Sequence, residues 1–219
     1  MQKTKSPQEI EIKLPVLDVP ALKNRLKQLH TRKVIPRTFE SNTLYDSSGK
    51  ALARRGQLIR IRIEQPAPKG KQARPIQNPI AILTFKGPVQ KLKDSKKVTK
   101  SPHNRFKIRE ELEVTLGGAD QMIGILQALG FRPVFRYEKF RTTYALPGIR
   151  NVKIEFDETP VGEFLELEGN MGSIDRASRL LGYTQSDYMT RTYGELYIAD
   201  CRRRGIRPAN MIFSSTEQK

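Results

Sequence analysis

The stretch QEIEIKLPV, residues 8–16, alternates charged and aliphatic side chains. Successive side chains of a β-strand point to opposite faces, so the stretch predicts a strand with one charged and one aliphatic face. The charged face carries Glu9, Glu11 and Lys13. In an ordinary sheet the aliphatic face would be buried and the charges would face water. The other strands therefore decide which face of this one points inward.

Seven further segments have strand-like sequences. They are residues 39–46, 57–64, 80–86, 106–116, 135–146, 151–158 and 163–169. With the first stretch included, six strands carry a charged face, and together these faces mix acids and bases. In the later strands the charged residues are Arg60, Arg62, Glu64, Lys107, Arg109, Glu111, Glu113, Lys139, Arg141, Lys153, Glu155, Asp157, Glu166 and Glu168.

Four segments predict helices. They are residues 18–30, with Asp18 as the N-cap, and residues 119–129, 173–181 and 187–204, each followed by a glycine. Amphipathic helices need an apolar surface to cover, and the aliphatic strand faces supply one. We therefore predict an α+β fold in which eight antiparallel strands form a closed or nearly closed barrel, with helices packed outside and charges lining a tunnel. Such charges must be paired, hydrated or bound by a ligand.

The composition limits the kinds of partner that the protein can be expected to bind. The chain has 219 residues with 40 Lys and Arg against 23 Asp and Glu, a formal net charge of +17, which favours a polyanionic partner. Two basic stretches, about residues 65–79 and 88–105, are predicted to be long loops. With Cys201 as its single cysteine, the chain can form neither an internal disulfide nor a cysteine zinc site. Residues 1–8 are not followed by the apolar segment of a secretory signal, and the sequence contains no apolar run of the ~20 residues that cross a bilayer. We therefore expect a cytoplasmic protein without a membrane partner.

The ordered series of strand motifs resembles the CYTH superfamily, also called triphosphate tunnel metalloenzymes. Beside Glu9-x-Glu11-x-Lys13, the similar motifs are NTLYD at 42–46, Arg60-x-Arg62, LTFKGP with Lys86, REELEV, Lys139-x-Arg141 and EFDETPVGEFLELEG. The branch that these motifs resemble most is that of the class IV adenylyl cyclases. The resemblance implies one tunnel domain over residues 1–205, followed by a polar tail at 206–219.

The resemblance also implies roles for the charged residues. Carboxylates offer the hard oxygen ligands that Mg²⁺ or Mn²⁺ prefers, and the predicted metal ligands are Glu9, Glu11, Asp157, Glu166 and Glu168. The predicted substrate contacts are Lys13, Arg60, Arg62, Lys86, Arg109, Glu111, Glu113, Lys139, Arg141 and Lys153. Glu9, Glu11, Lys13, Lys139 and Arg141 are the predicted catalytic set. Tyr188, Tyr193 and Tyr197 are expected to anchor the last helix to the barrel.

Three functions stay open at this point. The first is conversion of ATP to cyclic AMP and pyrophosphate. The second is hydrolysis of an inorganic or organic triphosphate, such as tripolyphosphate, a nucleoside triphosphate or thiamine triphosphate. The third is binding of polyphosphate or RNA without catalysis, with nucleic acid the less favoured partner. The oligomeric state also stays open, with a homodimer as one option.

Overall fold

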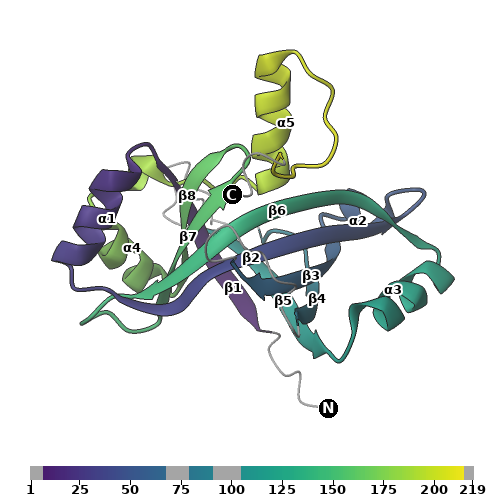
Figure 1. The fold of residues 1–219 in the computed structure, drawn as a ribbon, viewed down its shortest axis with the longest axis horizontal. Helices are drawn as coiled ribbons and strands as arrows, with labels where there is room; N and C mark the ends of the chain where they lie inside the picture. The colour runs from purple at the N-terminus through teal and green to yellow at the C-terminus, as the bar shows by residue number, and fades with distance from the viewer. Residues whose placement is uncertain (1–6, 68–78, 91–104, 215–219) are drawn as a thin grey trace, which may run out of the picture.

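The eight strands form a closed barrel in the computed structural model, which describes residues 7–67, 79–90 and 105–214 (Figure 1). Its strands are β1 (Gln8–Val16), β2 (Arg32–Ser47), β3 (Leu58–Pro66), β4 (Ile80–Lys86), β5 (Lys107–Leu116), β6 (Phe131–Ala145), β7 (Val152–Thr159) and β8 (Gly162–Gly169). They run around the barrel in the order β1-β5-β4-β3-β2-β6-β7-β8, and each neighbouring pair is antiparallel. The predicted fold is thus confirmed.

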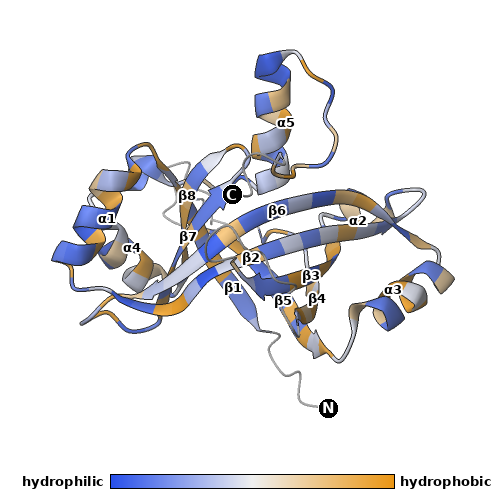
Figure 2. Cartoon of the chain, viewed as in Figure 1, coloured by the Kyte–Doolittle hydropathy of each residue, from blue (hydrophilic) through white to orange (hydrophobic). Residues whose placement is uncertain are grey.

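The aliphatic strand faces point outward and helices cover them. Helices α1 (Val19–Gln28) and α4 (Met171–Leu180) pack on β1, β7 and β8, where Ile12, Leu165 and Leu167 are at most 1% exposed (Figure 1). Asp18 caps α1 as predicted, because its carboxylate accepts the backbone N–H of Ala21 at 2.8 Å. Figure 2 shows the hydrophilic and hydrophobic residues that alternate along these strands. The barrel is therefore inverted, with its hydrophobic core outside the sheet.

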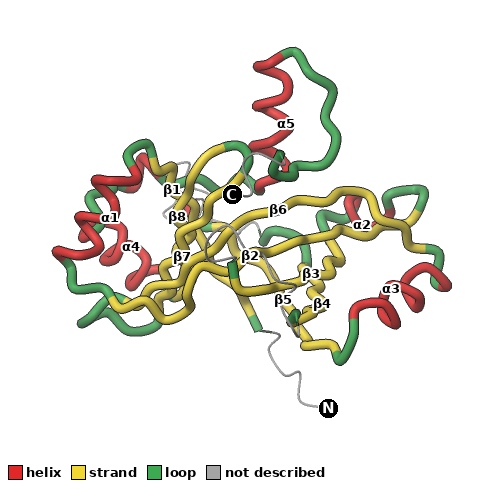
Figure 3. Tube along the Cα trace, in the orientation of Figure 1, coloured by secondary structure: helices red, strands yellow, loops and turns green. Residues whose placement is uncertain are grey.

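Helices α2 (Ala51–Arg54) and α3 (Ala119–Ala128) lie toward the other end of the long strands (Figure 3). Leu126 of α3 packs against Tyr45 and Ile61 on the outer faces of β2 and β3. The short helix α2 is absent from the prediction. Asp46 stabilises it, since its carboxylate accepts the backbone N–H groups of Leu52 and Ala53, both at 3.0 Å.

Strand β2 begins at Arg32, earlier than the predicted start at residue 39. The segment between contains Pro36, a residue that favours turns. It is nevertheless a strand because β2 and β6 pair along their whole lengths, from Arg32 opposite Ala145 to Ser47 opposite Phe131. The long β2–β6 ribbon thus comes from tertiary pairing and not from local propensity.

The last helix, α5 (Tyr193–Arg204), is shorter than predicted. The predicted start at residue 187 is wrong, because Thr192 and Glu195 form a capping box: the Thr192 hydroxyl accepts the Glu195 N–H, and the Glu195 carboxylate accepts the Thr192 N–H. A 3₁₀ turn, η2 (Gln185–Asp187), precedes it. Helix α5 projects from the barrel with its first turn nearest the strands (Figure 1).

Beyond α5 the chain returns to β6. The backbone N–H of Met211 donates to the carbonyl of Arg136, and its carbonyl accepts the N–H of Glu138, both at 2.9 Å. Met211 is fully buried, and Phe213 packs on Phe140 with ring centroids 5.2 Å apart. Within the described part of the predicted tail, residues 206–214, Met211 and Phe213 thus pack on the barrel, whereas residues 206–210 are exposed.

Several predictions fall outside the described residues. The basic stretches predicted at 65–79 and 88–105 lie there for the most part, as do residues 215–219 of the predicted tail. The predicted domain boundary after residue 205 stays a prediction. Within the described residues, no helix has the length and apolar character to cross a membrane.

Candidate active site

The barrel encloses a cavity of about 350 Å³ whose lining is dominated by ionisable side chains. The acids are Glu9, Glu11, Glu40, Glu64, Glu111, Glu113, Glu155, Glu166 and Glu168. The bases are Lys13, Arg60, Arg62, Lys86, Lys107, Arg109, Lys139, Arg141 and Lys153. Nine acids face nine bases, so the lining is formally neutral although the whole chain carries +17. The excess positive charge therefore lies outside this lining.

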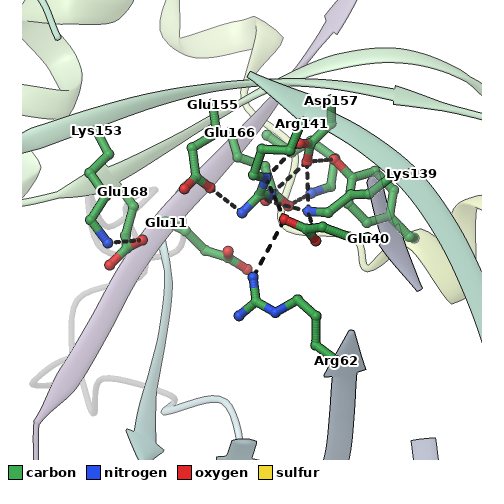
Figure 4. Close-up of polar contacts among 12 residues, drawn as sticks. Glu11, Glu40, Arg62, Lys139, Arg141, Lys153, Glu155, Asp157, Glu166 and Glu168 are labelled. Carbon is green, nitrogen blue, oxygen red and sulfur yellow. Dashed lines mark hydrogen bonds and ion pairs between the residues drawn. The ribbon is translucent and has the colours of Figure 1, made fainter. Parts of the chain in front are cut away.

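Asp157 on β7 holds one group of these side chains together (Figure 4). Arg141 donates to both of its carboxylate oxygens at 2.6 Å, and Lys139 Nζ lies 3.0 Å from Oδ2. The Tyr193 hydroxyl of α5 donates to the same Oδ2 at 2.5 Å. Asp157 is fully buried behind the cavity lining. Its predicted role as a metal ligand stays a prediction, but its oxygens are already engaged by three donors.

Glu40 of β2 is the second buried carboxylate of this group, and Figure 4 shows it below Lys139 and Arg141. It lies 3.4 Å from Lys139 Nζ, 3.7 Å from Arg141 Nε and 3.5 Å from Arg62 NH1. Burial alone would raise its pKa, but Lys139, Arg141 and Arg62 outweigh burial and lower the pKa of Glu40 to about 2. Glu40 is therefore a fixed negative charge between three cations.

The four predicted metal ligands of β1 and β8 are each paired with a base. Glu9 accepts from Lys86 at 2.7 Å and Glu11 from Lys107 at 2.5 Å. Glu166 pairs with Lys13 and Arg141, and Glu168 with Lys153 at 3.2 Å. Glu11 and Glu168 lie directly opposite each other across the β1–β8 ladder. In the described part of the chain, no three His, Cys, Asp or Glu side chains form a group ready to hold a metal ion.

Burial and neighbouring charges together shift the pKa values of the β1 carboxylates in opposite directions. Burial, together with Glu11, raises the pKa of Glu9 to about 7 even though Lys86 opposes the shift. Burial acts on Glu11 as well, but Lys107, Lys13 and Lys86 together outweigh it and lower the pKa of Glu11 to about 2. Burial likewise raises the pKa of Glu155 to about 7 despite its contact with Arg141.

Arg60 and Arg62 of β3 extend into the cavity from the opposite wall. Both donate to Glu113 through NH2, at 3.2 Å and 3.0 Å, and Arg60 NH1 donates to the Tyr137 hydroxyl at 3.2 Å. Their Nε atoms are buried and have no hydrogen-bond partner. Among the described residues, the other such atoms are Glu40 Oε2 and the amide atoms of Asn42. All of these atoms belong to β2 and β3, so this wall has unused buried donors and acceptors.

The structure brings the predicted substrate contacts into one cavity, but their surroundings differ. Lys86 Nζ lies 2.9 Å from Glu111, and Lys153 is mostly exposed. Arg109 lines the cavity while its guanidinium donates to the carbonyls of Gly87, at 2.9 Å, and Gly56, at 3.3 Å. Arg109 thus links two turns at one end of the barrel.

Glu40 and Tyr193 belong to the site, although the sequence-based prediction places neither of them in the tunnel. Glu40 shares the alternation of Thr38 and Asn42, but the opposite face of that strand is not consistently aliphatic, so the pattern is weak there. Tyr193 was expected only to anchor the last helix. Its contact with Asp157 depends on how α5 docks, for which the sequence carries no local signal.

The comparisons with known proteins agree with this geometry. The family model of the CYTH domain matches residues 7–193. A Methanocaldococcus jannaschii protein named "Putative adenylate cyclase MJ0240" is 26% identical over 174 residues, which cover 79% of this chain and 83% of that protein.

Solved structures share the fold at low sequence identity. A Vibrio parahaemolyticus structure described as "a putative adenylate cyclase" has a TM-score of 0.66 at 17% identity, covering 88% of this chain and 98% of that one. The PH1819 protein of Pyrococcus horikoshii has a TM-score of 0.64 at 21% identity, covering 88% and 99%. Hippeastrum HpAC1, described as a "putative adenylyl cyclase" with "a dominant" triphosphatase activity, has a TM-score of 0.51 at 16% identity, covering 91% and 97%. Since the family model spans most of the sequence, this chain belongs to the CYTH domain family.

Proposed function

We propose that this protein is a divalent-metal-dependent enzyme that acts on a triphosphate inside the barrel and converts ATP to cyclic AMP and pyrophosphate. The observation that carries the proposal is the pair of unpartnered, buried Nε donors of Arg60 and Arg62 within a cavity that Lys13, Lys139 and Arg141 also line. A buried N–H group without an acceptor costs about 1–3 kcal/mol, and phosphate oxygens would supply acceptors. The names of the Methanocaldococcus and Vibrio proteins support the choice of a cyclase.

The charge of the cavity supports a metal requirement. Its acids and bases cancel, so a triphosphate would bring several negative charges without compensation. Mg²⁺ or Mn²⁺ would neutralise phosphate charge and orient the phosphate oxygens. Glu9, Glu11, Glu166 and Glu168 offer the required carboxylate oxygens, which their basic partners would release to the ion while turning to the phosphates. Asp157 is the weaker candidate ligand, because three donors already use its oxygens.

The bases of the cavity would act by binding and charge neutralisation. In the cyclase reaction the ribose 3′ oxygen bonds to the α-phosphorus and releases its proton, while the bond from that phosphorus to the pyrophosphate oxygen breaks. Lys13, Lys139 and Arg141 would hold the triphosphate chain and stabilise the charge that gathers on the leaving pyrophosphate. Arg60 and Arg62 would bind further phosphate oxygens from the opposite wall.

Hydrolysis of a triphosphate is the second candidate function. The described triphosphatase activity of the Hippeastrum protein favours it, and the same bases would serve it. In that reaction a water oxygen bonds to the terminal phosphorus and gives up a proton to solvent, while the bond from that phosphorus to the bridging oxygen breaks. Orthophosphate and the remaining diphosphate are released. The two reactions differ in whether the cavity holds a nucleoside with its 3′ hydroxyl in line.

Product analysis tests both functions. Purified protein is incubated with ATP or with tripolyphosphate, in Mg²⁺, Mn²⁺ or EDTA. Cyclic AMP and pyrophosphate from ATP would support the cyclase, whereas orthophosphate from tripolyphosphate without a cyclic nucleotide would support the triphosphatase. The double variant Glu9→Gln with Glu11→Gln should lose metal-dependent turnover, and Glu163→Gln, an exposed acid on β8, should keep it. No turnover of either substrate with either metal would contradict the proposal and leave polyanion binding as the function to test.

A further inference from the structure

Tyr193 connects α5 to the charged cavity. It is the first residue of α5, it is 7% exposed, and it lines the cavity together with Thr192 and Gly194. Its hydroxyl donates to Asp157 on β7. The face of its ring lies 3.9 Å from Lys13 Nζ on β1 and 5.3 Å from Lys139 Nζ on β6, measured to the ring centroid. One side chain of α5 therefore contacts charged residues of three strands.

An aromatic ring holds a cation differently from a carboxylate. The ring attracts an ammonium group through its quadrupole. Because the ring is neutral, it does not neutralise the charge of the lysine as a carboxylate would. The ring also restricts the lysine side chain before the ligand arrives. Less rotamer freedom is then lost when the ligand binds, so the entropy cost of binding is smaller. Lys13 already pairs with Glu166, and Lys139 pairs with Asp157 and Glu40. The ring of Tyr193 adds a contact that would keep both lysines in place when an anion competes with these carboxylates for their charge.

The same residue seats α5 on the barrel. Its ring packs edge-on against Phe164 of β8, with centroids 5.7 Å apart, and lies 6.3 Å from the ring of Tyr137 on β6. Tyr197, one turn further along α5, packs against Phe135 with ring centroids 6.0 Å apart, and its hydroxyl accepts the backbone N–H of Ala209 at 3.2 Å. Tyr197 is not among the described residues that line the cavity. Helix α5 therefore has one aromatic residue, Tyr193, that reaches the cavity charges and another, Tyr197, that only anchors the helix.

We propose that Tyr193 is a positioning residue, which fixes the ammonium groups of Lys13 and Lys139 for the triphosphate and makes their placement depend on the seating of α5. The proposal rests on the proposed function, because it assigns these lysines to the triphosphate. It predicts that loss of the ring weakens anion binding beyond what loss of an anchor would cause.

Binding of inorganic tripolyphosphate tests the proposal. Isothermal titration in EDTA, and again with Mg²⁺, compares wild type with Tyr193→Leu, Tyr193→Phe and the matched control Tyr197→Leu. Tyr193→Leu should bind about tenfold more weakly, the loss expected for cation–π contacts in a desolvated site. Tyr193→Phe keeps the ring and should stay within about threefold of wild type, and so should Tyr197→Leu even where its melting temperature falls as far as that of Tyr193→Leu.

Equal weakening by Tyr193→Leu and Tyr197→Leu, or unchanged binding in Tyr193→Leu, would reduce Tyr193 to an anchor and overturn the proposal while the proposed function stands. A wild-type protein that binds no tripolyphosphate under either condition and turns over neither substrate would contradict the proposed function and this inference together.

A spectroscopic measurement decides the matter even if Tyr193→Leu does not fold. The ε-methylene resonances of Lys13 and Lys139, observed in protein with ¹³C-labelled lysine, should be shifted upfield by the ring in wild type and in Tyr193→Phe. If the ε-methylene resonances of Lys13 and Lys139 are not shifted upfield in wild type, the ring does not hold these lysines. Where Tyr193→Leu folds, the shifts should disappear in it and persist in Tyr197→Leu.

Discussion

Glu40 shows how a single buried charge can organise the cavity. It is 2% exposed and faces Arg62 and Glu64 from β3 and Lys139 and Arg141 from β6. Removing its charge leaves three buried cations with one compensating carboxylate fewer, which is a costly change in a low-dielectric interior. In the unfolded chain, Glu40 would protonate as the pH falls below the usual range of a glutamate. In the folded protein, the cations keep it ionised to a much lower pH.

The first prediction concerns the variant Glu40→Gln. The pKa of Glu40 is lowered from 4.5 to about 2, so its ionised form contributes about 3 kcal/mol to the free energy of unfolding at neutral pH. Because the folded pKa is the lower one, this contribution is complete above about pH 5 and disappears as the pH falls toward 2. Urea unfolding of wild type and Glu40→Gln at several pH values should show a difference that shrinks in acid.

The control for this variant is Glu158→Gln. Glu158 pairs with Arg37 at 2.7 Å on the surface, where both side chains are about a third exposed or more. Its removal should cost less than about 1 kcal/mol, since exposed ion pairs contribute little. A difference between Glu40→Gln and wild type that stays constant from pH 7 to pH 3 would contradict the role assigned to Glu40.

At the scale of the element, the segment after α5 is attached to the barrel through Met211. The sequence offers the apolar run MIF at 211–213 within an otherwise polar stretch, but it does not indicate which surface the run covers. Met211 is fully buried beside Phe164 and Tyr193, whereas its neighbour Ile212 is 46% exposed. One of the two adjacent apolar side chains is therefore a core residue.

The second prediction compares Met211→Ala with Ile212→Ala. Truncation of a buried methionine leaves a cavity, so Met211→Ala should lower the free energy of unfolding by about 2–4 kcal/mol. Ile212→Ala should change it by less than about 0.5 kcal/mol. Hydrogen exchange provides a second measure, because the Glu138 N–H that donates to Met211 should exchange faster in Met211→Ala. Equal stability of the two variants would mean that residues 206–214 are a free tail.

The elements also show how far the sequence determines the fold and the site. The strands and their charged faces could be predicted because alternation is a local signal that six strands repeat. The partner of each charge could not, since Lys86 meets Glu9 and Lys107 meets Glu11 only through the closure of the barrel at β1 and β5. The start of α5 was predicted wrongly at residue 187 although a local signal exists, because Thr192-x-x-Glu195 is a capping-box sequence.

At the scale of the whole molecule, the charge is distributed unevenly. The cavity lining is formally neutral, so the net charge of +17 lies elsewhere on the chain. Part of it lies in residues 91–100, outside the described residues, where five lysines accompany one aspartate. Exposed charge of one sign attracts an anionic substrate over distances comparable to the Debye length, which is about 10 Å at 0.1 M salt. The two sets of charge should therefore affect different kinetic constants.

The third prediction separates these two sets. Replacing Lys91, Lys93, Lys96, Lys97 and Lys100 by glutamine should lower kcat/KM for the triphosphate severalfold at low salt, because the attraction that speeds encounter is weakened. The effect should fade at 0.5 M salt, and kcat should stay unchanged, because the buried pairs of the cavity are little screened. A matched variant neutralises five exposed bases on or near α1 and α4: Lys23, Lys27, Lys33, Arg176 and Arg179. If both variants lower kcat/KM equally, net charge alone attracts the substrate; if neither does at low salt, the exterior charge has no part in its capture.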